Sequence, residues 1–207
     1  MDRNKLLALF ENELSCIKNP ILHDIILSCY EKSDDTFFYI PSSSTGKYHP
    51  EICNKEHGLV IHIKLVFEYA RILIDATFKY YEINKREKIQ DLILTAILLH
   101  DISKRKYYKK YSDYEYHPIT SHDIVKDVLD SKRDTLFILQ QNDEELLLNM
   151  IKNHMGIYTP KECEKPIEKY SIQELIVYYS DILASKRNQN HIPYIEGMYL
   201  QVKEILA

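Results

Sequence analysis

The string ILLHDISK, residues 97–104, places a histidine and an aspartate side by side at the end of an apolar run with helical spacing. Adjacent residues on a helix point about 100° apart, so His100 and Asp101 cannot both be core filler. Burying a charged carboxylate without a partner is costly, and a shared cation would offset that cost. Mixed nitrogen and oxygen ligands suit Mn, Fe or Zn better than Ca or Mg. The doublet therefore predicts a metal centre.

Further histidines and an aspartate follow the same logic at other points of the chain. The ordered set is His62, His100, Asp101, His117, His154 and Asp181. Each member lies at or near the end of an expected helix, or on its apolar face. A helical bundle can direct such side chains from several helices into one internal site.

The apolar residues recur with helical spacing nearly throughout the chain. The expected helices run from Leu6 to Ile17, from Pro20 to about Tyr30, from Gly58 to Tyr81, over residues 85–103, from Ser121 to Leu129, from Asn142 to near His154, from Ser171 through Asp181, and from about Pro193 to the C-terminus. Ser121 is expected as an N-cap, and two capping boxes are expected, Asn142 with Glu145 and Ser171 with Glu174. Residues 33–56 are expected to be a long loop, and long ordered loops are often functional.

The composition favours one all-α domain, a single-domain helical bundle. A length of 207 residues fits one domain, and only four glycines argue against a glycine-rich nucleotide fold and an all-β fold. Within residues 1–207 we expect N-terminal helices over 1–35, a core over 36–187 and a C-terminal helix over 188–207.

Charge and cysteine content exclude several other classes of protein. The net charge of -4 is not that of a dedicated nucleic-acid binder. The four cysteines form no C-x-x-C pair, which argues against a thiolate zinc site and favours reduced cysteines in a cytoplasmic protein. The N-terminus lacks the apolar region of a signal peptide, and no apolar run reaches the ~18 residues that span a membrane.

Five segments, in order, resemble the motifs of one enzyme family. HGLVIH (57–62) is similar to GGLxxH, and HDISK (100–104) is similar to HDxGK. HPITSHDIV (117–125), NHMGIY (153–158) and ELIVYYSDILASK (174–186) are similar to the later segments. The chain thus resembles the HD superfamily of metal-dependent phosphohydrolases, which implies the HD type of helical bundle.

The resemblance implies a ligand set. The first ion would be held by His62, His100, Asp101 and Asp181, while His117 and His154 would complete a second site that shares Asp101. One or two divalent ions are expected, Mn, Fe, Zn or Ni, with Mg as the alternative. Such an ion would bind phosphate oxygens and lower the pKa of a water molecule. His122 competes with His117, because it lies only five residues further on.

Other residues are expected to contact the substrate. Lys104 could hold a phosphate or stabilise charge in the transition state, beside a catalytic Asp101. His49 and His122 are further candidates for substrate binding. The segment YIPSSSTGKYHP (39–50) is similar to one that precedes the HD domain in HD-type 3′→5′ exoribonucleases. Those enzymes also carry an N-terminal oligonucleotide-binding barrel, and this chain has two expected helices there, which favours a smaller substrate.

The expected function is hydrolysis of a phosphate ester in a nucleotide or short oligonucleotide. The alternative is a catalytically weak nucleotide-binding sensor or regulatory scaffold, since Ser103 and Met155 replace the family's usual glycine and second histidine. A third option is an exonuclease subunit whose RNA-binding domain belongs to a partner, with the basic and aromatic stretch RKYYKKY (105–111) as the contact. The expected partners are a phosphorylated small molecule or nucleotide, or a short single strand of nucleic acid, and no membrane. A homodimer is also a possible assembly.

His23 and Asp24 form a second doublet, but they lack the flanking motif. We interpret them as structural residues.

Overall fold

The computed structural model describes residues 2–43, 46–104, 116–133, 139–187 and 194–207. Helices are the regular structure of these ranges, which confirms the all-α, single-domain bundle. The α-helices are α1 (Arg3–Leu9), α2 (Glu11–Ser15), α3 (Pro20–Lys32), α4 (Gly58–Phe78), α5 (Ile83–Leu99), α7 (His117–Lys132), α8 (Gln141–Lys152), α9 (Ile172–Ala184) and α10 (Ile195–Leu206). Short 3₁₀ helices are η1 (Asp35–Phe38), η2 (Glu51–Asn54), η3 (Gly156–Tyr158) and η4 (Ile167–Lys169).

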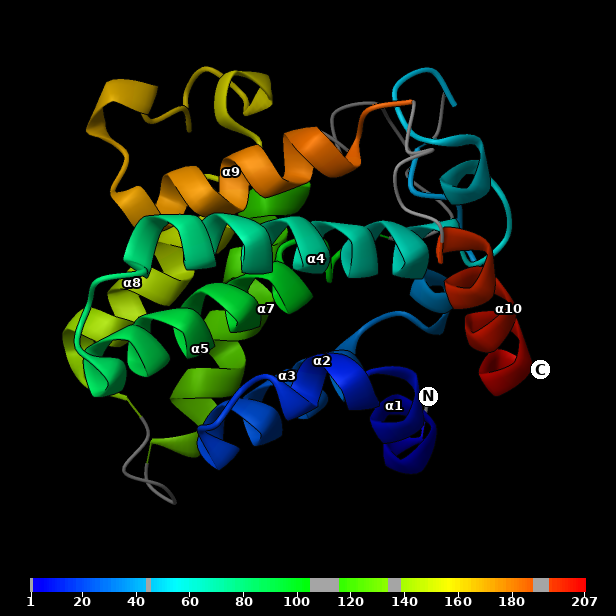
Figure 1. Ribbon diagram of the computed structural model, residues 1–207, viewed down its shortest axis with the longest axis horizontal. Helices are drawn as coiled ribbons and strands as arrows, with labels where there is room; N and C mark the ends of the chain where they lie inside the picture. Colours follow the sequence, from blue (N-terminus) through cyan, green and yellow to red (C-terminus); the bar gives the residue numbers. More distant parts are fainter. Residues whose placement is uncertain (1, 44–45, 105–115, 134–138, 188–193) are drawn as a thin grey trace.

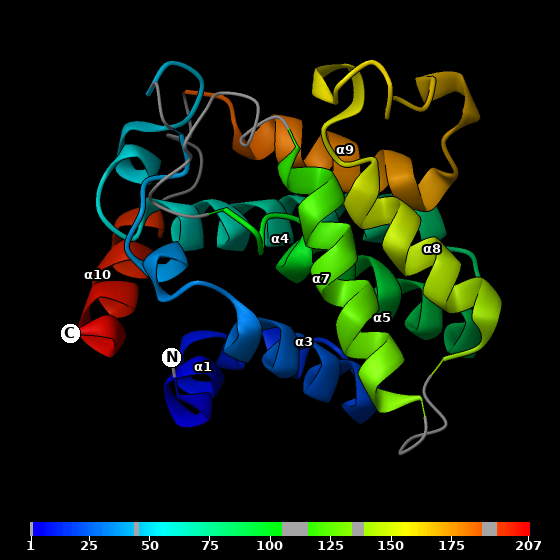
Figure 2. The same cartoon turned by 180° about the vertical axis from the view of Figure 1, so that it is seen from behind.

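Helix α4 is the central element of the bundle. It packs against α9, α5 and α10, and every residue from Gly58 to Phe67 is buried (Figure 1). Helices α7 and α8 pack on each other and face the reader when the molecule is turned (Figure 2). Helix α10 contacts both α4 and α1, so the two ends of the chain lie at the same end of the molecule. The helices that carry the candidate ligands therefore surround a common interior.

The N-terminal helices share this core. The expectation of one helix from Leu6 to Ile17 is wrong, because the backbone leaves helical geometry at Phe10 and separates α1 from α2. The Phe10 ring stacks on that of Tyr30 at 4.8 Å between centroids. Glu13 forms a buried ion pair with Lys64 on α4, at 2.7 Å. These contacts make residues 1–35 part of the bundle's interior packing.

Two expected helix starts are wrong and one is confirmed. Helix α7 begins at His117, not Ser121, because Pro118 is favoured in the first turn and fixes the helical φ. The box of Asn142 and Glu145 is absent: α8 begins at Gln141, and the residue before it makes no side-chain cap. The box of Ser171 and Glu174 at the start of α9 is present with both of its hydrogen bonds.

Helix ends also differ from expectation, and one of them matters for the site. Helix α5 ends at Leu99 rather than 103, so His100 and Asp101 lie in the turn that follows it. Helix α4 ends at Phe78, and the expected loop over 33–56 contains η1 and η2. The stretch RKYYKKY, Pro193 and His191 lie outside the described residues. No described helix has the length and apolarity that a membrane crossing needs.

Candidate metal centre

The structure brings the predicted metal-ligating residues together. They come from α4 (His62), the turn after α5 (His100 and Asp101), the first residue of α7 (His117), the turn after α8 (His154) and α9 (Asp181). Their donor atoms form three overlapping groups within which all atoms lie within 4.8 Å of one another. All are buried apart from Asp181, whose side chain is 19% exposed. Because most of these residues lie at helix ends, packing of the helices is what assembles the cluster.

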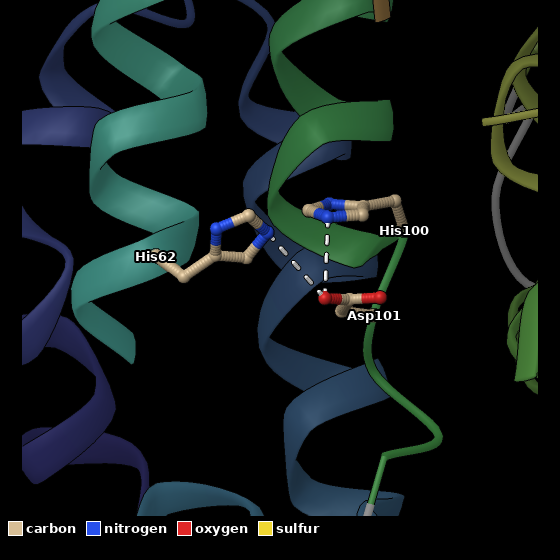
Figure 3. Close-up of side chains that lie close together, drawn as sticks. All are labelled: His62, His100 and Asp101. Atoms are coloured by element: carbon tan, nitrogen blue, oxygen red, sulfur yellow. Dashed lines mark ion pairs between the residues drawn. The ribbon is translucent and has the colours of Figure 1, made fainter. Parts of the chain in front are cut away.

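Asp101 lies at the centre of the cluster and divides it into two halves. Its Oδ2 is 3.4 Å from His100 Nε2 and 3.8 Å from His62 Nε2 (Figure 3). Its Oδ1 is 2.9 Å from His117 Nε2 and 3.5 Å from His154 Nε2. One carboxylate thus presents one oxygen to each of two histidine pairs, which is the arrangement of a ligand that bridges two cations.

Each half has a further close contact between ligand atoms. His62 Nε2 lies 3.0 Å from Asp181 Oδ1, which adds a second carboxylate to the half that contains His100. In the other half, His117 Nε2 lies 3.0 Å from His154 Nε2. Nitrogen ligands that each lie about 2.1 Å from one ion are about 3.0 Å apart in octahedral and about 3.4 Å apart in tetrahedral geometry. The spacing of the donor atoms therefore suits coordination of a common ion.

Two of the histidines are held in the tautomer that a metal requires. His100 Nδ1 is 2.6 Å from the carbonyl oxygen of Ile97, and His154 Nδ1 is 2.8 Å from that of Ile151. A carbonyl oxygen only accepts, so each Nδ1 carries the hydrogen and each Nε2 presents a lone pair to the cluster. Metal-ligating histidines are typically fixed by such a bond from their second nitrogen.

Several buried polar atoms of the cluster lack a hydrogen-bond partner among the described residues. They are His62 Nδ1, His100 Nε2 and Asp101 Oδ1. Asp101 Oδ1 lies 2.9 Å from His117 Nε2. Unpaired buried polar atoms are costly and rare in folded proteins. A divalent ion would satisfy His100 Nε2 and Asp101 Oδ1, so the residues present fit the metal centre that the sequence predicts.

The electrostatics keep most of these groups in the form that binds metal. Burial lowers the pKa of His62, and burial together with Lys104 lowers the pKa of His117 to about 4. Burial opposes ionisation of Asp101, yet His100 and Lys104 hold the pKa of that carboxyl well below its usual range. Burial opposes protonation of His100, but the charges of Asp101 and Asp181 and the hydrogen bonds to Asp101 and to the carbonyl of Ile97 together raise its pKa.

The other predicted site residues fall in three different places. Lys104 is buried with Nζ 2.6 Å from Asp101 Oδ2, so its ammonium lies inside the cluster. His49 is also buried, and its ring lies 4.8 Å from that of His62; burial lowers its pKa to about 3. His122 is partly exposed on α7 with Nδ1 2.8 Å from Asp123, and it belongs to none of the metal-capable groups of described residues. Of the two competing histidines, the geometry favours His117.

Three serines support the cluster, and one of them, Ser185, was not singled out from the sequence. Ser103 donates to the carbonyl oxygen of His117 at 3.0 Å, and Ser121 donates to Ser103 at 3.0 Å, so the turn after α5 is tied to α7. Ser185 lies between Asp181 and His49, at 3.5 and 3.3 Å. Ser185 could have been found from the sequence, because it follows Asp181 by four residues, about one helical turn, and caps the end of α9.

Comparison with known proteins gives one match. The family model described as HD domain matches residues 59–186, more than half of the chain, and this range contains all six clustered residues. No curated protein and no solved structure matches the chain significantly. The chain therefore belongs to the HD domain family, whose members are generally metal-dependent hydrolases.

Proposed function

We propose that this protein is a metal-dependent phosphohydrolase that cleaves a phosphate ester of a nucleotide or short oligonucleotide. The observation that carries the proposal is the position of Asp101, whose two oxygens face two separate pairs of histidine nitrogens. His62, His100, Asp101 and Asp181 would hold one ion; Asp101, His117 and His154 would hold a second. Such ions bind phosphate oxygens and lower the pKa of a water ligand.

The chain's own residues supply the rest of the chemistry. Asp101 keeps its carboxylate charge among the histidines, because His100 and Lys104 hold its pKa low. Lys104 places an ammonium group 2.6 Å from that carboxylate, where it can also donate to a substrate phosphate and offset its charge. The burial of the cluster excludes bulk water and strengthens these interactions. Substrate would enter beside Asp181, the most exposed of the clustered residues.

The scaffold alternative loses one of its supports. Ser103, where the family's usual residue is glycine, makes hydrogen bonds that tie the doublet's turn to α7. The replacement is accommodated in the fold without opening the cluster. The ordered convergence of all the predicted ligands supports hydrolysis over a purely regulatory role.

The test is Mn²⁺-dependent hydrolysis of bis-p-nitrophenyl phosphate beside p-nitrophenyl phosphate, with Asp101→Ala as the control. We expect hydrolysis that requires Mn²⁺ and is lost in Asp101→Ala, and the better substrate distinguishes diester from monoester chemistry. A panel of nucleotides and short oligonucleotides then defines the substrate class. Wild-type protein no more active than Asp101→Ala with Mn²⁺, Fe²⁺ or Zn²⁺, on the panel as well as on both compounds, would contradict the proposal.

A further inference from the structure

The loop before α4, described at residues 42–43 and 46–54, carries the buried side chain of His49. The backbone nitrogen and the hydroxyl of Ser42 both donate to the carbonyl oxygen of Cys53, at 2.8 and 2.9 Å, and so close the loop. Asn54 Nδ2 donates to the carbonyl oxygen of His49 at 3.3 Å. The backbone that carries His49 is thus anchored from both sides.

This loop packs directly on the first turn of α4. A side chain at Gly58 would place its Cβ 2.0 Å from the carbonyl oxygen of Cys53, so only glycine permits this approach. The contact lies one helical turn before His62. A shift of this loop would therefore displace the start of α4, the helix that carries His62.

His49 contacts one candidate ligand, His62, directly and is linked to a second, Asp181, through a serine. Its ring meets the ring of His62 at 73° with 4.8 Å between centroids. Its Nε2 lies 3.3 Å from Ser185 Oγ, and Ser185 donates to Asp181 Oδ1 at 3.5 Å. His49 thus supports His62 by packing and Asp181 through one serine.

The direction of these hydrogen bonds follows from the carboxylate. An ionised carboxylate only accepts, so the hydroxyl of Ser185 donates to Asp181 and its oxygen accepts from His49 Nε2–H. His49 Nδ1 is buried with no hydrogen-bond partner among the described residues. Among the described residues, the polar contact of the His49 ring is therefore its hydrogen bond from Nε2 to Ser185.

We propose that His49 is a positioning residue of the metal centre, which holds the ring of His62 and the carboxylate of Asp181 in the orientation that binds a divalent ion. The inference rests on the function proposed above, and it assigns His49 a role other than the substrate contact expected from the sequence. Outer partners of metal ligands typically contribute 10–100-fold to metal affinity. Because His49 lies outside the matched residues 59–186, this support comes from the preceding loop.

Titration calorimetry with Mn²⁺ alone tests the inference without substrate. His49→Phe keeps a ring against His62 and loses the bond to Ser185, while Ser185→Ala removes the bridge to Asp181. We expect each variant to weaken Mn²⁺ binding about 10-fold, the typical effect of losing an outer partner. The double variant should be no weaker than His49→Phe, because both changes break one chain of bonds. His49→Ala should be weaker still, since it also removes the ring.

A histidine from the end of the same segment serves as the control for lost stability. His57 precedes α4 in a left-handed conformation, and its Nδ1–H donates to the carbonyl oxygen of Phe38 at 2.8 Å. His57→Asn, which tolerates that conformation, should lower the melting temperature and keep the Mn²⁺ affinity. Wild-type Mn²⁺ affinity in the His49 variants, with a raised KM for bis-p-nitrophenyl phosphate, would overturn the inference in favour of a substrate contact. Wild-type protein that binds no divalent ion would instead overturn the proposed function, and this inference with it.

Discussion

The chain contains two adjacent His-Asp doublets, and their surroundings are very different. His23 and Asp24 lie on α3, where His23 Nε2 is 2.8 Å from the carbonyl oxygen of Ile17. Asp24 accepts from Arg3 and from Lys132, each at 2.6 Å, and its side chain is 35% exposed. The second doublet, at residues 100–101, is buried among histidine nitrogens instead.

The comparison shows that the dipeptide itself does not specify a metal centre. Arginine and lysine side chains at the surface satisfy the carboxylate of Asp24, so it needs no further cation. Oδ2 of Asp101 is paired with Lys104, whereas Oδ1 faces the nitrogens of His117 and His154 among the described residues. The two carboxylates differ in the kind of nitrogen that faces them, and the motifs that flank residues 100–101 supply the histidines that lie beside Asp101.

The largest difference between the doublets should appear when each aspartate is replaced by its amide. Asp101→Asn removes the charge that both histidine pairs face while it keeps the size of the side chain. We expect loss of Mn²⁺-dependent hydrolysis beyond the roughly 100-fold that an outer partner contributes. Asp24→Asn, assayed in parallel, should stay within about two-fold of wild type, as changes remote from a site usually do. Similar losses in both variants would show that the doublets do not differ in this way.

A smaller effect should separate the two halves of the cluster. His154→Gln removes a nitrogen from the half that faces Asp101 Oδ1 and leaves the half with His62 and His100 intact. We expect the bound Mn²⁺ to fall from two ions per chain to one, with hydrolysis reduced. Metal analysis of dialysed protein measures this, with His23→Gln from the other doublet as the matched control. An unchanged number of ions in His154→Gln would mean that the two halves are not separate sites.

The smallest effect concerns folding stability at the surface doublet. The hydrogen bond from Lys132, with that from Arg3, outweighs burial and lowers the pKa of Asp24. A folded pKa below the unfolded one contributes stability above the unfolded value near 4, and this contribution is lost as the pH falls through the folded pKa. Because the side chain is about one-third exposed, we expect Asp24→Asn to cost at most about 1 kcal/mol at pH 7.

Denaturant unfolding of wild type and Asp24→Asn at several pH values measures that contribution. The difference in the free energy of unfolding should be largest at neutral pH and should shrink in acid. A difference that grows as the pH falls would mean that protonated Asp24, rather than the carboxylate, makes the stabilising contacts.

Much of the site was predictable because its residues lie within local motifs at helix ends. His62, His100, Asp101, His117, His154 and Asp181 were expected to converge, and they do. Local spacing carries this information, since each motif fixes where a side chain stands relative to the end of its own helix. The Ser171 and Glu174 box was predictable for the same reason.

The remaining features depend on contacts between distant parts of the chain. The start of α7 moved four residues from expectation because Pro118 outweighs Ser121, whose hydroxyl bonds Ser103 across the interface. The break at Phe10 follows packing on Tyr30, twenty residues away. The link from His49 through Ser185 joins positions 136 residues apart. The spacing of residues along one helix gives no information about partners that lie far away in the sequence.

The most direct test of the central claim is diffraction from crystals grown with Mn²⁺, with data collected to locate the ion by its anomalous signal. The account predicts anomalous density beside Asp101, between its carboxylate and the histidine pairs of residues 62 and 100 and of residues 117 and 154. Mn²⁺ bound only at surface carboxylates such as Asp24, with none beside Asp101, would contradict it.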